Sequence, residues 1–313
     1  YCLSRCLHIV ADLGVADAMD DSPKTAAELA ESVGASPDAL SRMLRLLASH
    51  GVFEMRGDGF GHSDASKMLR GDHPMSMRDH ARMWGMPVFW ESFGAMGHSA
   101  RTGLPAMPEV FPEGLWARFA GHPEEARVFN GAMAAKARGT ISGILASYDF
   151  SDFATVGDIG GGSGHLLRAV LDAAPDARGV LFDLPHVIGE ASVASERLSL
   201  RAGDFFRDEL PVCDAYLLME VIHDWDDEKS IAILRAVRRA APAGAKVLFI
   251  ESIVPEDPGP DRSKTLDIVM LTILGGKQRT RDEYRDLLEK SGFAFRREID
   301  TGAGVSIMEA EAV

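Results

Sequence analysis

Apolar and polar residues follow a helical period over the first 50 residues. Residues 7–20 carry apolar side chains at helical spacing, and Thr25 followed by Glu28 is a capping-box pattern that predicts a second helix. Ser36 and Pro37 suit the N-cap and first position of a third helix, with an apolar stripe of Leu40, Met43, Leu44 and Leu47. Residues 52–63 predict a hairpin with a Gly-Asp-Gly turn, so the front of the chain has a winged-helix pattern.

From residue 155 onward, short apolar strands alternate with helical stretches. The sequence predicts strands at 155–159, 179–183, 198–202, 214–220 and 245–251, with a helix at 166–174 between the first two. Such alternation is typical of a parallel sheet covered by helices on both faces. The last two segments, 293–299 and 305–313, flank a short turn and predict a closing antiparallel hairpin.

The composition is that of a folded chain with a sizeable core. The chain has 313 residues, 46% hydrophobic and 26% charged, which suggests about two domains. No apolar run approaches the roughly 20 residues of a membrane helix. Three cysteines cannot form a disulfide framework, which indicates a cytoplasmic location, and Cys2, Cys6 and His8 are too few for a metal site. The chain begins with Tyr1 rather than Met and shows no signal-peptide pattern, so we expect its start to be trimmed.

The net charge of the chain distinguishes between two possible functions of the winged-helix pattern. A winged helix can bind DNA or serve as a packing and dimerisation module. The chain has 33 basic and 47 acidic residues, a net charge of −14, which repels phosphate backbones. The predicted helix at 37–50 exposes only Arg42 and Arg45, with His50 at its end, as basic groups. These observations favour packing or dimerisation over nucleic-acid binding.

The middle of the chain is rich in methionine and aromatic residues. Methionine is adaptable and aromatic rings are large and flat, so these side chains suit a pocket for a planar ligand. Packing between helices or between two copies of the chain is the alternative, and we expect it for most of them. The residues are Met68, Met75, Met77, Met83, Met86, Met96, Met107, Trp84, Phe89, Trp90, Phe93, Phe111, Trp116, Phe119 and Phe129.

A glycine-rich loop follows the strand at 155–159. Gly160, Gly162 and Gly164 allow a tight turn and close approach of the backbone to a ligand. Asp183 ends the next strand, where a carboxylate can accept hydrogen bonds from the hydroxyls of a ribose. Together they predict a ligand that contains adenosine. The dinucleotide fingerprint requires a third glycine or alanine where His165 or Leu167 stands, which argues against NAD.

Two further groups of residues follow later strands. Asp204 and Phe205 could bind an adenine amino group and ring face, or they could form a turn with a core aromatic. His223 lies just after the strand at 214–220, at the end of the sheet where ligands bind in such folds. Its pKa suits a general base, and Glu251 at the end of the adjacent strand could orient it. Asp226, Asp227 and Glu228 fit the start of the following helix.

These motifs, in this order, resemble the plant-type, caffeate-like family of S-adenosylmethionine-dependent O-methyltransferases. They are DIGGGSG (158–164), FDLPHVI (182–188), GDFF (203–206), HDWDDE (223–228), IESIVPE (250–256), DIVML (267–271) and GGKQRT (275–280). The resemblance covers nearly the whole chain. It implies an α/β class I methyltransferase fold, with a Rossmann-like seven-stranded sheet and an N-terminal winged-helix dimerisation domain. The expected divisions are 1–95 for dimerisation, 96–145 for a helical linker and 146–313 for catalysis.

The resemblance also implies roles for individual residues. His223 matches the general base, Glu251 the carboxylate that holds it, and Gln278 the position of a second group beside it. The expected contacts to S-adenosylmethionine, whose product is S-adenosylhomocysteine, are Gly160, Gly162, Asp183, Leu184, Asp204, Phe205 and Met219. The expected contacts to the acceptor are Trp90, Phe129, Met133, Asp224 and Met270. No metal is expected.

Two residues depart from the family pattern. The second flanking group is often a glutamate, and here it is Gln278, which can form a hydrogen bond to the histidine but carries no charge. A lysine is common four residues before the histidine, and here it is Met219. The base is therefore weaker or the acceptor more acidic, and one cofactor contact is lost or replaced.

The expected function is metal-independent methylation of a hydroxyl on an aromatic small molecule, such as a phenol, phenazine or polyketide. His223 assists in-line displacement, and the protein is a homodimer that binds neither membrane nor nucleic acid. One alternative is a relative that binds the same cofactor but catalyses hydroxylation or decarboxylation. Another is a winged-helix regulator with a ligand-sensing domain. The sequence leaves the acceptor and the choice between oxygen and nitrogen open.

Overall fold

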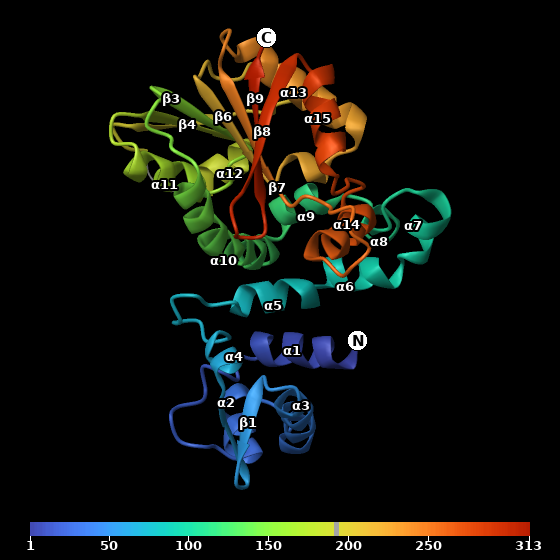
Figure 1. The fold of residues 1–313 in the computed structure, drawn as a ribbon. Coiled ribbons are helices and arrows are strands. Elements are labelled where there is room, and N and C mark those ends of the chain that lie inside the picture. The colour runs from blue at the N-terminus through green and yellow to red at the C-terminus, as the bar shows by residue number, and fades with distance from the viewer. Residues whose placement is uncertain (191–193) are drawn as a thin grey trace. The chain divides into compact units, whose positions relative to one another are not determined.

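The predicted strands form one sheet in the computed structural model, which describes residues 1–190 and 194–313 (Figure 1). The order is β5-β4-β3-β6-β7-β9-β8. The first five strands in this order are parallel, while β9 is antiparallel to both β7 and β8, so the predicted parallel sheet and closing hairpin are confirmed. The strands are β3 (Thr155–Ile159), β4 (Arg178–Asp183), β5 (Leu198–Ala202), β6 (Ala215–Met219), β7 (Lys246–Glu251), β8 (Phe293–Asp300) and β9 (Ser306–Ala312).

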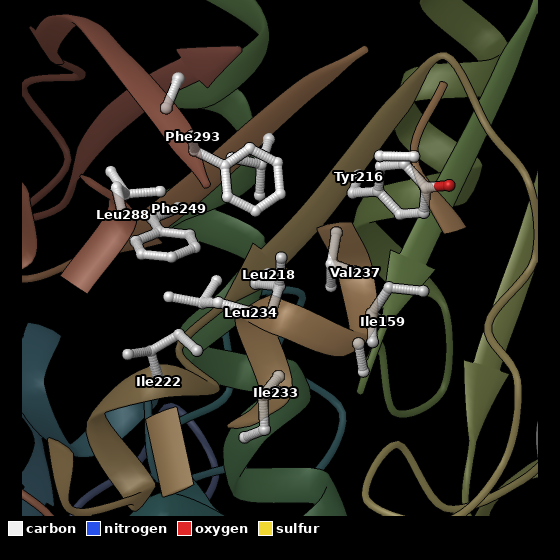
Figure 2. Close-up of a cluster of buried hydrophobic side chains, with 14 of the residues drawn as sticks. Ile159, Tyr216, Leu218, Ile222, Ile233, Leu234, Val237, Phe249, Leu288 and Phe293 are labelled. Carbon is white, nitrogen blue, oxygen red and sulfur yellow. The ribbon is translucent and has the colours of Figure 1, made fainter. Parts of the chain in front are cut away.

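Helices cover both faces of this sheet, which explains its nearly continuous apolar strands. On one face, Tyr216 and Leu218 of β6 belong to a buried cluster with Leu234 of α13 and Leu288 of α15 (Figure 2). On the other face, Leu217 of β6 packs in a cluster with residues of α11. The helices of this part are α11 (His165–Ala173), α12 (Pro185–Glu190), the short 3-10 helix η1 (Ile222–Asp224), α13 (Asp227–Ala240), α14 (Arg262–Ile273) and α15 (Arg281–Lys290).

The strand order places the candidate residues at one edge. The chain reverses direction across the sheet between β3 and β6, which are neighbours in it. Ligands of such sheets bind beyond the carboxyl ends of the strands at this reversal. The glycine-rich loop follows β3 and η1 follows β6, so both leave the sheet at this point.

The first residues form a small helical module with a wing. It contains α1 (Cys2–Asp12), α2 (Ala26–Val33), α3 (Pro37–Ser49), β1 (Phe53–Arg56) and β2 (Gly59–His62). Thr25 and Glu28 form the predicted capping box, and β1 pairs with β2 in the predicted hairpin. Ser36 is the N-cap of α3, although its side chain makes no capping hydrogen bond.

The prediction of one helix over 7–20 was wrong in its extent. The helix ends at Asp12, and residues 13–18 are turns, because Gly14 has a φ of +71° that a helix cannot continue. The apolar residues Val15, Ala16 and Met19 nevertheless pack in the core of this module, so their burial was correct and their helical spacing was not.

The described chain divides into two units. One contains residues 1–94 and 113–138, and the other contains residues 95–112 and 139–313. Residues 96–145, expected as one linker, are divided between the two units, and the expected domain boundaries stay a prediction. The remaining helices are α4 (Asp64–Lys67), α5 (Arg78–Gly85), α6 (Pro87–Gly94), α7 (Gly97–Thr102), α8 (Met107–Val110), α9 (Leu115–Gly121) and α10 (Pro123–Ser147). In the described residues, no helix combines the length and apolar character needed to cross a bilayer.

Candidate active site

The loop after β3 is a cradle of glycines. Gly160, Gly162 and Gly164 have φ values of +72°, +58° and +75°, which favour glycine. A Cβ atom on Gly162 would meet nothing within 4 Å, whereas one on Gly160 would lie 3.0 Å from Val221. The backbone at Gly162 therefore faces open space in which a ligand could approach closely.

Asp183 lies beside this loop, as the sequence predicted. Its Oδ2 accepts a hydrogen bond from the Gly162 backbone N–H at 2.8 Å, and its Oδ1 accepts one from Leu184 at 2.7 Å. Burial raises the pKa of Asp183, and these two N–H groups oppose that shift. A carboxylate has about four acceptor positions, so about two remain for the hydroxyls of a ribose.

Asp158 is a member of this site that the sequence analysis quoted in a motif but gave no role. It lies in β3, one residue before the end of the strand, and is 2% exposed. Its Oδ2 has no hydrogen-bond partner among residues 1–190 and 194–313. Burial, and next the charge of Asp183, raise the pKa of Asp158 to about 7. A buried acceptor without a partner beside a glycine cradle fits a cationic or hydrogen-donating ligand. The signal in the sequence was an acidic residue near a strand end, two residues before the first glycine of the loop.

Asp204 and Phe205 lie in a turn that contacts aromatic side chains. The Asp204 carboxylate accepts a hydrogen bond from the Phe206 N–H at 2.9 Å, so it stabilises its own turn. The ring of Phe205 lies 4.8 Å from that of Phe206 and 6.0 Å from that of Trp225. A Cβ on Gly160 would lie 3.8 Å from the Phe205 ring, which places Phe205 beside the glycine loop. Their contact with adenine stays a prediction.

His223 and Glu251 are brought together by the pairing of β6 with β7, as expected. His223 is 5% exposed and Glu251 is 0% exposed. The Nδ1 of His223 lies 2.8 Å from Oε2 of Glu251, while Oε1 accepts hydrogen bonds from the backbone N–H groups of Ile222 (3.0 Å) and His223 (3.3 Å). Glu251 therefore contacts both the imidazole and the turn that carries it.

Gln278 reaches the same ring nitrogen. Its side-chain amide lies 2.8 Å from Nδ1 of His223, and its backbone N–H donates to Asp267 at 2.8 Å. A neutral imidazole carries one hydrogen, which the Glu251 carboxylate draws to Nδ1. In the structure the Nε2 end of the Gln278 amide faces Nδ1, and a hydrogen bond to a protonated Nδ1 requires the amide to turn by a half-turn so that its oxygen faces the ring. This tautomer leaves Nε2, which lies 3.4 Å from Oδ1 of Asp224, with its lone pair free.

The surroundings of His223 raise its affinity for a proton. Burial alone would lower the pKa of the imidazole, but the charge of Glu251 and its contact with the ring outweigh burial, with smaller contributions from Asp224 and Glu220. The pKa of His223 is raised from 6.5 to about 9. The site therefore favours an imidazolium at neutral pH and stabilises the charge that forms when His223 accepts a proton.

The loop that carries Gln278 contains two residues that the sequence analysis passed over. A Cβ on Gly276 would lie 2.0 Å from the backbone oxygen of His223, so only glycine permits this approach. Arg279 is 0% exposed and donates hydrogen bonds to the carbonyl groups of Ile222 and Trp225. Both lie within the quoted GGKQRT segment, but their partners are about 50 residues away in the chain.

The residues expected at the acceptor have different surroundings. Met270 is buried on α14 in the same unit as His223. Trp90 packs against α1, with its ring 4.7 Å from the Arg5 guanidinium and 5.3 Å from the His8 ring. Phe129 packs among aromatic rings, the nearest being Phe119 at 4.8 Å. For Trp90 and Phe129 these contacts are the packing expected for most of the aromatic residues.

The surroundings of Met133, expected at the acceptor, and Met219, expected at the cofactor, do not test their roles. Met133 is half-buried on α10, and Met219, half-buried at the end of β6, packs against the core cluster on the α11 face of the sheet. Their contacts with acceptor and cofactor stay predictions. Among the described residues, no group of three or more His, Cys, Asp or Glu side chains has the arrangement of a metal site.

Comparison with known proteins decides the family. Residues 93–294 match the O-methyltransferase domain, and residues 1–72 match the O-methyltransferase dimerisation domain. The chain belongs to the O-methyltransferase family. Methyltransferases of this family use S-adenosylmethionine, and the chain is an S-adenosylmethionine-dependent O-methyltransferase.

Relatives of this O-methyltransferase act in bacterial secondary metabolism. The phenazine O-methyltransferase PhzM of Lysobacter antibioticus is 41% identical, over 100% of this chain and 94% of that protein. The mitomycin biosynthesis 6-O-methyltransferase of Streptomyces lavendulae is 36% identical, over 98% of this chain and 90% of that protein. A solved O-methyltransferase of neocarzinostatin biosynthesis, in complex with S-adenosylmethionine and 2-hydroxy-5-methyl naphthoic acid, has a TM-score of 0.84 and 33% identity, covering 100% of this chain and 97% of that one.

The raised pKa of His223 predicts the pH dependence of the O-methyltransferase. With His223 in the role of a general base, the imidazole must be neutral to accept a proton, so we expect kcat/KM to rise with pH along a limb with an apparent pKa above 6.5. Glu251→Gln removes the charge that raises this pKa and leaves the burial that lowers it, so the limb should move to lower pH. A His223→Ala profile controls for ionisation of the acceptor. A limb that moves to higher pH in Glu251→Gln would refute this electrostatic assignment.

Substitution at Gly276 tests the close approach of the loop to His223. Gly276→Ala should displace the backbone of His223 or the loop, because the added carbon would lie 2.0 Å from a backbone oxygen. We expect about 10²-fold lower kcat, the typical cost of a misplaced group about 1 Å from its position. Gly139→Ala is the matched control, because a Cβ there meets nothing within 4 Å. Equal activity of the two variants would show that the approach has no catalytic role.

Proposed function

We propose that this O-methyltransferase transfers a methyl group to a hydroxyl of an aromatic small molecule, with His223 as the general base. The observation that carries the proposal is the contact of the buried His223 imidazole with the buried Glu251 carboxylate at 2.8 Å. His223 lies just after the carboxyl end of β6, whose neighbour β3 leads into the glycine-rich loop, and Glu251 is the last residue of β7. A buried carboxylate that carries an imidazole at a ligand-binding edge suits proton transfer.

The residues around the loop fit S-adenosylmethionine. Gly162 presents backbone at the open side of the loop, and Gly160 allows the tight turn that precedes it. Asp183 retains acceptor positions for a ribose, and Asp204 with Phe205 suits adenine. Leu184 and Met219 supply apolar surface at strand ends, and the partnerless oxygen of Asp158 suits the amino end of the methionine part. When bound, the sulfonium group of this cofactor supplies an electrophilic methyl group.

The side chains of the O-methyltransferase have separate roles in proton transfer. Nε2 of His223 accepts the proton of the acceptor hydroxyl as its oxygen becomes nucleophilic. Nδ1 keeps its hydrogen toward Glu251, which stabilises the imidazolium, and Gln278 fixes the plane of the ring. A neutral amide in place of a second carboxylate stabilises the imidazolium less, so the acceptor hydroxyl should be comparatively acidic. No step in this scheme requires a metal.

The acceptor class follows from the relatives and from the composition of the chain. Relatives are named for a phenazine and for mitomycin biosynthesis, and one solved relative holds a hydroxylated naphthoic acid. Phe129, Met133 and Met270 are apolar side chains that suit a flat ring system. Because residues 1–72 match a dimerisation domain, we also propose that the protein functions as a homodimer.

His223→Ala tests the proposed base. Turnover of labelled S-adenosylmethionine with 2-hydroxy-5-methyl naphthoic acid or a hydroxyphenazine should fall by about 10²–10⁴-fold, the usual contribution of a general base. The Kd of S-adenosylhomocysteine, measured by calorimetry, should change by less than about threefold, because this change removes a transition-state contact. His50→Ala, at an exposed position on the small helical module, is the control.

Two results would contradict the proposal. Turnover of His223→Ala within a few-fold of the unaltered enzyme would show that another group, or the acceptor alone, loses the proton. Tight binding of the cofactor without any methylated product from a broad panel of phenols would favour the hydroxylase or decarboxylase alternative.

A further inference from the structure

The geometry points to Arg279 as a positioning residue for His223: its guanidinium fixes the one-turn helix η1 so that the imidazole stays against Glu251. This inference rests on the proposed role of His223 as the base. Arg279 has no expected contact with cofactor or acceptor, and it acts through the backbone that carries the base.

Arg279 is fully buried, and every N–H of its guanidinium has a partner. A guanidinium has five N–H donors in a rigid fork, which allows it to bridge several backbone groups at once. Its partners are the Asp227 carboxylate (2.9 Å from Nε and 2.7 Å from Nη2), the carbonyl oxygens of Ile222 (3.3 Å), Lys277 (3.3 Å) and Trp225 (2.9 Å), and the Ser230 hydroxyl (3.4 Å).

The partners lie on both sides of His223 in the chain. Ile222 precedes it by one residue and Trp225 follows it by two, so Arg279 holds the backbone before and after the base. Glu251 accepts hydrogen bonds from the N–H groups of Ile222 and His223. The turn therefore has a carboxylate at its N–H groups and a guanidinium at its carbonyl groups, the charges that the dipole of a helical turn favours.

Within residues 1–190 and 194–313, the buried Arg279 guanidinium forms an ion pair with one carboxylate, that of Asp227. This carboxylate is in the first turn of α13, and its side chain is 59% exposed. Partial burial would raise the pKa of Asp227, but the hydrogen bonds and charge of Arg279 outweigh it and lower the pKa. Asp227, predicted from the sequence as a helix-start residue, thus also anchors the guanidinium.

Arg279 also connects the two groups that contact the imidazole. It follows Gln278, whose side chain lies 2.8 Å from Nδ1 of His223, and its own backbone oxygen accepts a hydrogen bond from Val254, three residues after Glu251. One short segment thus contacts the His223 ring through Gln278 and the backbone on either side of His223 through Arg279. Movement of either end would alter the distance from Nδ1 to Glu251.

Two substitutions separate positioning from charge. Arg279→Met removes the charge and the donors, whereas Arg279→Lys keeps the charge and loses the fork. The readout is the pKa of the His223 imidazole, measured by NMR titration of the labelled full chain with S-adenosylhomocysteine present. Loss of the Arg279 cation alone would raise this pKa, whereas separation of His223 from Glu251 would lower it toward 6.5.

We expect the imidazole pKa to fall in both variants. Turnover of the hydroxylated aromatics above should fall by about 10²-fold in Arg279→Met and less in Arg279→Lys, with the Kd of S-adenosylhomocysteine within about threefold. Arg281→Met is the matched control. Arg281 lies two residues after Arg279, its side chain is 57% exposed, and it forms an ion pair with Glu298. If Arg279→Met does not fold, Arg279→Lys carries the test.

Other outcomes would overturn the inference. A pKa that rises in Arg279→Met and is unchanged in Arg279→Lys would show a charge effect, and no change in either would show a purely structural role. Failure of the proposed function is distinguishable: if His223→Ala keeps its turnover while the pKa still falls in the Arg279 variants, Arg279 positions a residue that is not the base.

Discussion

The contact between His223 and Glu251 is the constraint on which the rest of the site depends. A carboxylate with 0% exposure is costly to ionise unless its oxygens have partners, and here they face the imidazole and two backbone N–H groups. The pairing of β6 with β7 makes this contact possible, because it places the ends of the two strands side by side. The sheet therefore brings the turn that carries His223 beside Glu251.

The loops around this contact are organised to preserve it. Gly276 allows the GGKQRT segment to approach the backbone of His223, Gln278 contacts the imidazole and Arg279 holds the turn. Across the reversal point of the sheet, Asp158 and Asp183 form a second buried acidic group beside the glycine loop. One acidic centre lies beside the proposed base, and the other lies beside the glycine loop proposed to bind the cofactor. This division matches the two ligands that an O-methyltransferase must hold.

Sequence analysis could predict the elements and the pairings that follow from strand order. The alternation of apolar strands with helices predicted the sheet. Because neighbouring parallel strands end at one edge, the strand ends predicted Asp183 near the glycines and Glu251 near His223. It could not predict Gly276 or Arg279, because their partners lie about 50 residues away and are backbone atoms. The predicted helix over 7–20 was too long, because the turn at Gly14 ends it. The apolar residues after this turn are buried as they would be in a helix, so the pattern did not show the difference. The aromatic residues of the middle segment were recognisable only as a class.

The central claim would be tested most directly by a crystal structure with two ligands. These are S-adenosylhomocysteine and an unmethylated acceptor, such as a hydroxyphenazine that the enzyme turns over. The account predicts the acceptor hydroxyl within about 2.6–3.2 Å of Nε2 of His223, the distance required for proton transfer. Nδ1 should remain beside Glu251 in that complex. A hydroxyl held by another side chain, with His223 turned away from it, would contradict the account.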